Sequence, residues 1–297
     1  MQMDAIWRSK RLARHAGRHF ARASRYLPPA LVDALRYLAS DWEYMPQGWQ
    51  VEDAAIKGWN DPSVAKAQQE HWPTLVRNLQ GPGPLGVSHL PWSETRENRA
   101  DHNAMMSFGY VLALAARNKD RLSVLDFGGG AGHYFLYSQA LLPEVALEYH
   151  CQDLPYLCRL GREVLPQLQF HEAESEALGR RYDLVVSSSS LHYFEDWRGV
   201  VRRLASAADD LLYVARLQTV ARVPSFVVVQ RPDRAGYHTE YLSWFLNRDE
   251  VLHCFEEAGM ELRREFVYAE DWCVKGAPEK GTCRGFLFRR RSAEGDR

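Results

Sequence analysis

The 297-residue chain has little of what several classes of protein require. It has no run of about 18 apolar residues, the length that a membrane-spanning helix needs. Its first 26 residues contain no apolar core of about 7–15 residues, so we expect no secretory signal there. Its five cysteines are odd in number and form no Cys-x-x-Cys pair, which argues against a disulfide framework and a thiolate zinc site. These absences favour a reducing, cytoplasmic location.

The net charge also lacks a strong sign. With 37 Lys and Arg against 38 Asp and Glu it is −1, so we expect no nucleic-acid partner. Residues 1–26 nevertheless hold seven basic residues and one acid, which gives +6 and leaves −7 for the remainder. A helix would align the arginines that recur there every three or four positions: Arg11, Arg14, Arg18, Arg22 and Arg25. Such a helix fits two roles, weak contact with an anionic membrane surface or a solvated leader.

The composition of the sequence and its pattern of apolar residues change near residue 118. Residues 1–118 are rich in tryptophan and predict a helical arm and cap, interrupted by the irregular stretch Gly81–Pro91. From residue 119 to 297, short apolar runs alternate with amphipathic stretches. This alternation predicts an α/β domain with an open, mostly parallel sheet and helices on both faces, with an insertion at about residues 219–246.

The expected elements of that domain can be listed from the apolar runs. Strands are expected at Leu122–Phe127, Val145–Cys151, Leu168–His171, Asp183–Ser188 and Asp210–Ala215, with an added strand in Val223–Gln230 and a closing pair at Glu261–Tyr268 and Arg284–Arg290. Helices are expected at His133–Leu142, Pro155–Leu165, Asp196–Ala207 and from Arg248, capped by Asn247, to about Ala258. Ligands bind such sheets at the carboxyl ends of the strands, so functional residues should follow strands directly.

A glycine-rich loop follows the first of these strands, with glycines at 128, 130 and 132 after Asp126. Glycine lets the backbone turn sharply and approach a ligand closely. A dinucleotide fingerprint would place its third glycine at position 133, where the chain has His133. No Gly-Lys-Ser/Thr follows, which excludes a phosphate-binding P-loop.

The spacing of Asp126, Gly128, Gly130 and Gly132 resembles the first motif of class I S-adenosylmethionine (SAM) methyltransferases. The resemblance implies a Rossmann-like sheet of seven strands, mostly parallel with an antiparallel last strand, and SAM as cofactor, released as S-adenosylhomocysteine. A narrower resemblance, to a family of uncharacterised bacterial methyltransferases, lies in the segments Leu125–Gly130, Ser189–Tyr193 and Asn247–Glu250. Members of that family often belong to surface-polysaccharide or secondary-metabolite pathways, which implies a small-molecule or glycan substrate.

The second strand ends at a candidate ribose ligand. Asp153 stands 21 residues after Gly132 (153 − 132), about where a carboxylate is expected to accept hydrogen bonds from both ribose hydroxyls. Asp153 and Leu154 look like the adenosine-binding segment of small-molecule O-methyltransferases; the alternative is that Asp153 caps the helix from Pro155, and the two roles can coexist. The resemblance also implies an acid that accepts the adenine amino group. Glu174 aligns best, and Glu172 is the alternative.

Four serines end the fourth strand, and their small side chains fit a place where backbone flanks a ligand. Ser188 is the cofactor contact expected among them. His192 and Tyr193 follow and would lie beside the methyl donor. His192 could be a general base that deprotonates a hydroxyl acceptor near neutral pH, or it could only pack against the cofactor or cap the following helix.

Together these features predict a SAM-dependent methyltransferase that acts on a hydroxyl of a small molecule, glycan or secondary-metabolite intermediate. N- or C-methylation, a non-catalytic SAM-binding partner subunit and a nicotinamide oxidoreductase are the alternatives. The chain has no Asn-Pro-Pro-Tyr after the fourth strand, which argues against methylation of adenine or glutamine amides. No paired-carboxylate cluster is evident, so we expect no metal. The insertion and the aromatic segment Trp42–Trp49 would either line the acceptor pocket or simply pack.

Overall fold

The computed structural model describes residues 28–51, 53–88, 96–232 and 237–291, and the chain divides into two compact units, Met1–Ser40 and Asp41–Arg297. In the first unit the described element is helix α2 (Pro29–Leu38), which begins with proline at its first position. The basic stripe predicted between Arg11 and Arg25 lies outside the described residues. The predicted cap, residues 1–118, spans the first unit and the N-terminal part of the second.

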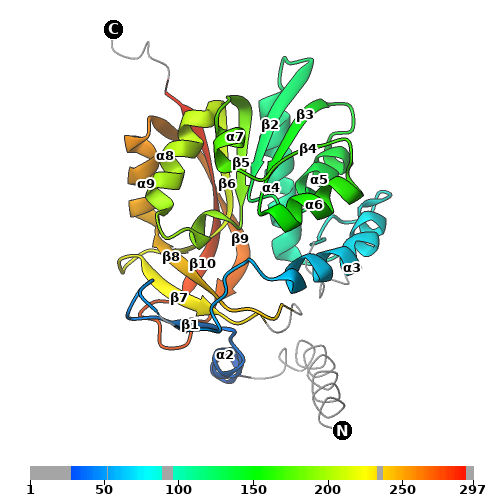
Figure 1. Ribbon diagram of the computed structural model, residues 1–297. Coiled ribbons are helices and arrows are strands. Elements are labelled where there is room, and N and C mark those ends of the chain that lie inside the picture. Colours follow the sequence, from blue (N-terminus) through cyan, green and yellow to red (C-terminus); the bar gives the residue numbers. More distant parts are fainter. Residues whose placement is uncertain (1–27, 52, 89–95, 233–236, 292–297) are drawn as a thin grey trace. The chain divides into compact units, whose positions relative to one another are not determined.

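The second unit is built on a twisted central sheet (Figure 1). Its main strands are β2 (Arg121–Phe127), β3 (Ala146–Gln152), β4 (Gln169–His171), β5 (Tyr182–Ser188), β6 (Ala208–Val220), β9 (Met260–Trp272) and β10 (Gly281–Arg290). Strands β4, β3, β2, β5 and β6 lie side by side in that order and are parallel. Strand β10 runs antiparallel to both β6 and β9. The predicted α/β Rossmann-like fold with an antiparallel last strand is confirmed.

Three further strands widen this sheet beyond the end of β5. They are β1 (Trp42–Tyr44), β7 (Phe226–Gln230) and β8 (Tyr241–Asn247). Strand β8 pairs with the last residues of β6, β7 pairs antiparallel with β8, and β1 pairs antiparallel with β7. The added strand expected in the insertion is β7. Strand β1 differs from the helical and irregular structure that the sequence predicts for this segment; its Trp42 is buried against Phe245 and Trp272.

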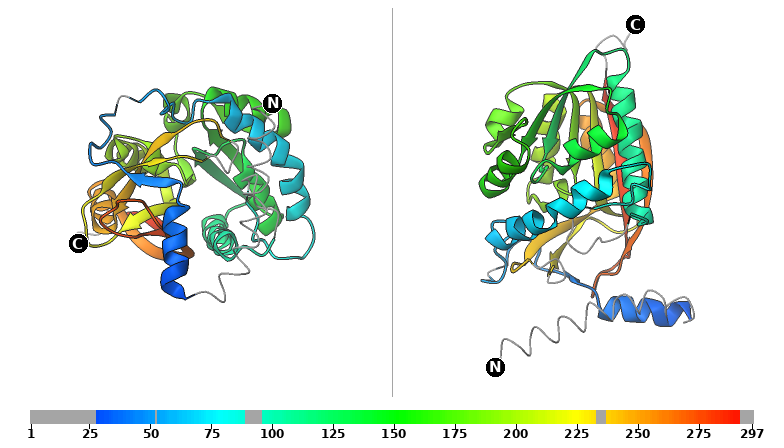
Figure 2. Two further views of the ribbon diagram at one scale, coloured as in Figure 1. Left: turned by 90° about the horizontal axis from the view of Figure 1, so that it is seen from below. Right: turned by 90° about the vertical axis from the view of Figure 1, so that its right-hand side faces the viewer.

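Helices cover both faces of the sheet (Figures 1 and 2). They are α3 (Pro62–Leu79), α4 (Arg99–Ala116), α5 (His133–Leu141), α6 (Pro155–Val164), α7 (Glu174–Leu178), the 3-10 turn η2 (Leu191–Tyr193), α8 (Trp197–Ala207) and α9 (Arg248–Glu257). One apolar cluster joins α4 and α5 to the sheet through residues such as Phe108 and Tyr137, and another joins α8 and α9 through Leu204 and Phe255. No helix among the described residues is long and apolar enough to cross a membrane.

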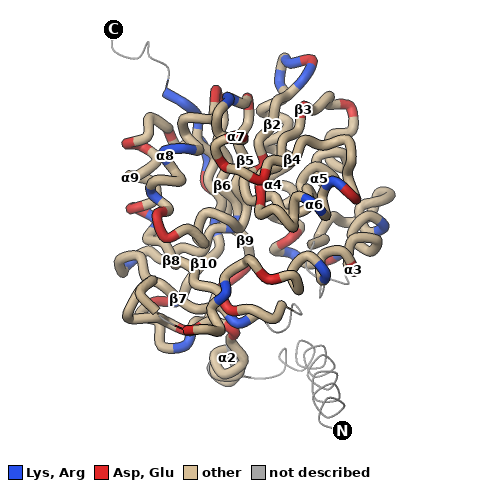
Figure 3. Tube along the Cα trace, viewed as in Figure 1, with Lys and Arg blue, Asp and Glu red and all other residues tan. Residues whose placement is uncertain are grey.

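Many charged residues form ion pairs on the surface, and these pairs contribute little to the stability of the fold. Figure 3 shows Lys and Arg interspersed with Asp and Glu along the chain. Arg198 of α8, for example, pairs with Glu250 of α9 at 2.7 Å. Exposed pairs of this kind contribute at most about 1 kcal/mol each. A single fully buried Leu or Phe of the apolar clusters, at about 1.5–3 kcal/mol, therefore contributes more than such a pair.

Asn247 links the insertion to the parallel sheet. Its side-chain oxygen accepts hydrogen bonds from the backbone N–H groups of Asp249 (2.9 Å) and Glu250 (3.2 Å), so it caps α9 as expected. Its side-chain amide donates to the carbonyl of Val223 at 2.8 Å. One side chain thus fixes both the start of α9 and the approach to β7.

We expect Asn247→Ala to lower the free energy of unfolding by about 2 kcal/mol, since both a helix cap and a hydrogen bond to the insertion are lost. Urea denaturation measures this change. Asn103→Ala, an exposed position inside α4, is the matched control and should change stability by less than about 0.5 kcal/mol. Equal effects of the two substitutions would contradict the role of Asn247.

Candidate active site

The glycine loop between β2 and α5 has the backbone shape that its sequence predicts. Gly128, Gly130 and Gly132 have φ values of +71°, +62° and +87°, in the left-handed region that other residues rarely adopt. A Cβ added at Gly128 would overlap the side chain of Ser190, which follows β5. The loop therefore lies directly against the end of β5, with no room for a side chain between them.

Gly129, which the motif treats as variable, is equally constrained. A Cβ there would overlap the Asp126 carboxylate and lie 2.7 Å from the sulfur of Cys151. The uninterrupted run of three glycines was the sequence signal for this position. Asp126 itself is 1% exposed, so it supports the loop from the sheet side.

Asp153 joins the loop to the end of β3. One of its carboxylate oxygens accepts the Gly130 N–H at 2.7 Å, and the other accepts the N–H of Leu154 at 2.7 Å. The cap position of α6 is Leu154, without a side-chain hydrogen bond, so Asp153 is not a helix cap of the usual kind. Burial raises the pKa of Asp153 to about 6, although the two N–H groups oppose the shift.

The serines after β5 tie that strand to the glycine loop. The Ser190 hydroxyl donates to the Phe127 carbonyl at 2.9 Å, and the Ser188 hydroxyl lies 2.6 Å from the Tyr134 hydroxyl of α5. Ser189 has a φ of +53°, so the chain turns sharply as it leaves the strand. These small side chains let the two strand ends approach each other closely.

His192 and Tyr193 follow in η2. The His192 ring is fully buried, and neither of its nitrogens has a hydrogen-bond partner within the part of the chain that the structure describes. Burial lowers its pKa to about 3, so the imidazole is neutral at physiological pH. The Tyr193 hydroxyl donates to the Gln230 side chain at 3.2 Å, and burial raises its pKa. A catalytic role for either residue stays a prediction.

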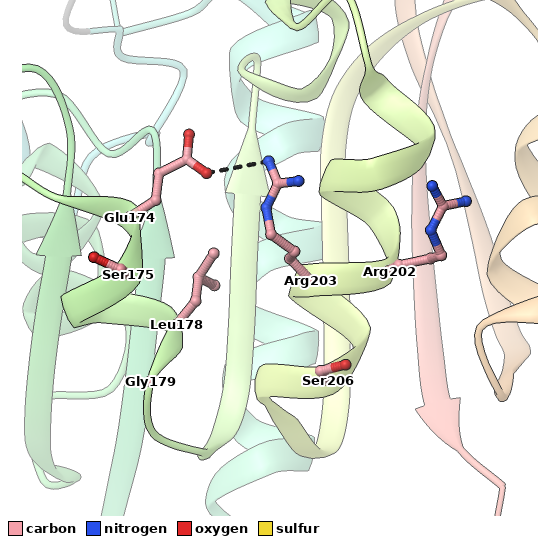
Figure 4. A pocket seen from close by; sticks show the side chains of 7 residues that line it. All are labelled: Glu174, Ser175, Leu178, Gly179, Arg202, Arg203 and Ser206. Carbon is pink, nitrogen blue, oxygen red and sulfur yellow. Dashed lines mark hydrogen bonds and ion pairs between the residues drawn. The ribbon is translucent and has the colours of Figure 1, made fainter.

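The two acids considered for the adenine are both in ion pairs. Glu174 pairs with Arg203 at 3.1 Å and lines a groove between α7 and α8 (Figure 4). Glu172 pairs with Arg162 of α6 at 2.6 Å. The carbonyl of His171 accepts the Asp153 N–H at 3.3 Å. Because Glu172 is the next residue after His171, it is linked to Asp153 more directly than Glu174 is.

Five aromatic residues gather beside the loop, and we call them the aromatic box: Trp59, Tyr156, Tyr193, Tyr237 and Tyr241. The Trp59 ring stacks on Tyr241 at 4.5 Å between centroids and meets Tyr193 edge-on at 5.0 Å. The Tyr156 hydroxyl, from the first turn of α6, donates to the Trp59 carbonyl. The insertion thus supplies Tyr237 and Tyr241, whereas Trp42 and Trp49 pack elsewhere.

Helix α3 brings a polar side chain to the same place. The Gln68 side chain is buried, and its oxygen lies 3.5 Å from the point that a Cβ on Gly130 would occupy. Sequence reasoning missed Trp59, Tyr156 and Gln68, because only the tertiary fold brings them to the loop. Within the described segments, no group of three or more His, Cys, Asp or Glu could hold a metal ion, and independence from metal stays a prediction.

A family model described as a methyltransferase domain matches residues 98–265, which include the glycine loop, Asp153 and His192. The chain belongs to this family. The protein is therefore a SAM-dependent methyltransferase of the class I superfamily, with SAM as its methyl donor, and the oxidoreductase and non-catalytic alternatives are set aside.

Solved structures of other methyltransferases are similar to this chain at low identity. Magnesium protoporphyrin IX methyltransferase from Synechocystis is 16% identical over 77% of this chain and 98% of its own, with a TM-score of 0.46. The CcbJ methyltransferase from Streptomyces caelestis is 15% identical over 77% and 97%, with a TM-score of 0.48. A SAM-dependent methyltransferase from Clostridium acetobutylicum is 10% identical over 64% and 92%, with a TM-score of 0.44. No curated protein matches the chain.

The methyltransferase should lose stability as its buried Asp126 ionises. Burial raises the pKa of Asp126 to about 7, and the hydrogen bond from Tyr149 at 3.1 Å only partly opposes this. The folded state therefore binds the proton more tightly than the unfolded state does. Stability should fall as pH rises from about 4 to 7, by up to about 1.4 kcal/mol per pH unit from this group.

Asp126→Asn should flatten that part of the pH dependence, because the amide does not titrate. Urea unfolding of the ligand-free protein between pH 4.5 and 7.5 measures the slope for both forms. Identical slopes in the two proteins would show that Asp126 is not the titrating group.

Proposed function

We propose that this methyltransferase moves a methyl group from SAM to a hydroxyl of a small molecule or a glycan intermediate. The observation that carries the proposal is the fully buried His192, whose two ring nitrogens have no partner among the described residues. Buried polar atoms in folded proteins are normally hydrogen-bonded. An acceptor hydroxyl beside η2 would donate a hydrogen bond to one of these nitrogens. That nitrogen could then take up the proton of the hydroxyl.

The residues around the glycine loop fit SAM. An ionised carboxylate has about four acceptor positions, and Asp153 uses two of them for Gly130 and Leu154. The remaining two match the vicinal hydroxyls of the ribose. Leu154 would contact the adenine ring, and either Glu174 or Glu172 would accept its amino group.

The rest of the loop would shape the floor of the cofactor site. Gly128, Gly130 and Gly132 keep side chains away from the cofactor, Ser188 borders it from β5, and Asp126 supports the loop from below. When bound, SAM supplies an electrophilic methyl group on a positively charged sulfur. The protein's main task is then to align the acceptor oxygen with that group.

His192 would accept the acceptor's proton late in the reaction. A pKa of about 3 makes the imidazole a weak base toward an ordinary hydroxyl. An oxygen that is gaining a methyl group becomes far more acidic, so even a weak base can remove its proton as transfer proceeds. Tyr193 would hold the acceptor side of the site through its hydrogen bond to Gln230.

The aromatic box would form the acceptor wall. Flat aromatic surfaces with a few polar groups suit ring-shaped acceptors, and here the amides of Gln68 and Gln230 flank the rings. This combination supports a ring that carries hydroxyl groups, which includes sugars and aromatic secondary metabolites.

SAM with a labelled methyl group should transfer label into one fraction of host material: small molecules, lipids, polysaccharide, protein or nucleic acid. Asp153→Asn should transfer far less label, because the ribose loses its carboxylate and the cofactor binds only weakly, and Asp209→Asn at the surface should match the wild type. Base-stable label on oxygen supports the proposal. Label on nitrogen or carbon would contradict the hydroxyl assignment without affecting the methyltransferase assignment.

SAM affinity should fall as pH drops below about 6, the raised pKa of Asp153, because the protonated acid has lost acceptor positions for the ribose. The expected loss approaches tenfold per pH unit, the limit for one titrating group. Calorimetry with S-adenosylhomocysteine between pH 5 and 8 measures it. The weak residual binding of Asp153→Asn should show no such step, and a step that persisted there would have to come from another group.

Once an acceptor is known, His192→Gln should lower kcat by about 100-fold or more while SAM affinity changes by less than about threefold. Glutamine keeps polar atoms at this position but cannot take up the proton. An unchanged kcat would leave His192 with a packing role only.

A further inference from the structure

Arg216 follows the point where β6 passes the end of β5, and it is part of no motif considered above. Its guanidinium forms ion pairs with Asp101 of α4 at 2.7 Å and with Glu270 of β9 at 3.3 Å. The Arg216 side chain is 19% exposed and that of Asp101 is 8% exposed. A guanidinium has five N–H donors, so these two bonds leave donors without a partner in the described part of the chain.

The backbone at this position is unusual. Arg216 has a φ of +52°, and it lies at a register shift between β6 and β10. The adjacent strand also leaves the sheet through a left-handed residue, Ser189, whose N–H is bonded to the carbonyl of Ala215. Non-glycine residues in this conformation are uncommon, and they concentrate at functional sites.

The charge of Arg216 acts on residues of the active site. Burial lowers the pKa of His133, the residue that follows the glycine loop, and the positive charge of Arg216 lowers it further. It also opposes the burial-raised pKa values of Tyr134 in α5 and Tyr193 in η2. The backbone next to Arg216 contacts the segment that follows β5, since the Ala215 carbonyl accepts the Ser189 N–H at 3.0 Å.

We propose that Arg216, together with Asp101 and Glu270, binds the amino-acid tail of SAM. The open edge of the guanidinium would take the tail's carboxylate, since an arginine fork matches a carboxylate in shape and charge. One of the two acids would accept the tail's ammonium group. The three side chains come from three separate elements, β6, α4 and β9.

The dimensions of the sheet agree with this assignment. The strand order is β3, β2, β5, β6, so the strands of Asp153 and Arg216 are three spacings apart, about 14 Å at about 4.8 Å each. With the ribose at Asp153, the tail must extend toward β5 and β6 or out of the site.

The charges are also complementary. SAM carries a carboxylate, an ammonium and a sulfonium, which sum to +1. With both acids ionised, Arg216, Asp101 and Glu270 sum to −1. The cluster thus offers a partner of opposite sign to each end of the zwitterionic tail, and its net charge suits the sulfonium.

Two ligands separate the tail from the rest of the cofactor: S-adenosylhomocysteine, and 5′-methylthioadenosine, which has the same adenosine and sulfur but no amino-acid tail. Arg216→Asn should weaken the binding of S-adenosylhomocysteine by about 10- to 100-fold. It should change the affinity for 5′-methylthioadenosine by less than about twofold. Calorimetry measures both affinities. Asparagine tolerates the left-handed backbone, which protects the fold. Arg216→Lys keeps the charge and should give an intermediate loss.

Arg248→Gln is the control, because it removes an arginine with a comparable ion pair, to Glu265 at 2.7 Å, without touching the loop. It should leave both ligands unchanged. If Arg216→Asn weakened the binding of both ligands equally, Arg216 would only stabilise the packing of α4 against the sheet. No weakening of either would remove Arg216 from the cofactor site. Both results would overturn the proposal.

Discussion

The hydrogen bond from the Gly130 N–H to the Asp153 carboxylate is the contact on which the site depends. It joins the loop after β2 to the end of β3, so the two neighbouring strands terminate in one connected surface. The loop reaches Asp153 only because its glycines adopt left-handed backbone conformations. In turn, the carboxylate can be buried there because backbone donors partly offset the cost of burial.

Much of this arrangement could be predicted from sequence because it is local. The apolar runs gave β2, β3, β5 and the closing pair β9–β10 within a few residues, and the glycine spacing located the loop. Strand β1 was missed because three residues are too short to show an alternating pattern, and its burial comes from Phe245, some 200 positions away. Gln68, Trp59 and Arg216 were missed for a similar reason. Nothing in their neighbours distinguishes them, although Arg216 does directly follow an expected strand.

The polar interior of the site is costly in the ligand-free protein. Among the residues that the structure describes, both ring nitrogens of His192 and one carboxylate oxygen of Asp126 have no hydrogen-bond partner. A protein selected only for stability would replace such groups with apolar ones. Their presence at the ends of β2 and β5 agrees with the proposed roles in binding and chemistry, and the apolar clusters on both faces of the sheet compensate for their cost.

On the proposed function, in which the aromatic box forms the acceptor wall, the added hairpin constrains how this enzyme can change its acceptor. The aromatic box takes Tyr241 from strand β8, and alternate residues of a strand point to opposite faces. Losing or gaining one residue in β8 after Tyr241, with the pairing of the later residues kept, would turn that ring to the opposite face. Related enzymes should therefore diverge in this hairpin by substitution, or by length changes in pairs, while the parallel strands that carry the glycine loop stay as they are.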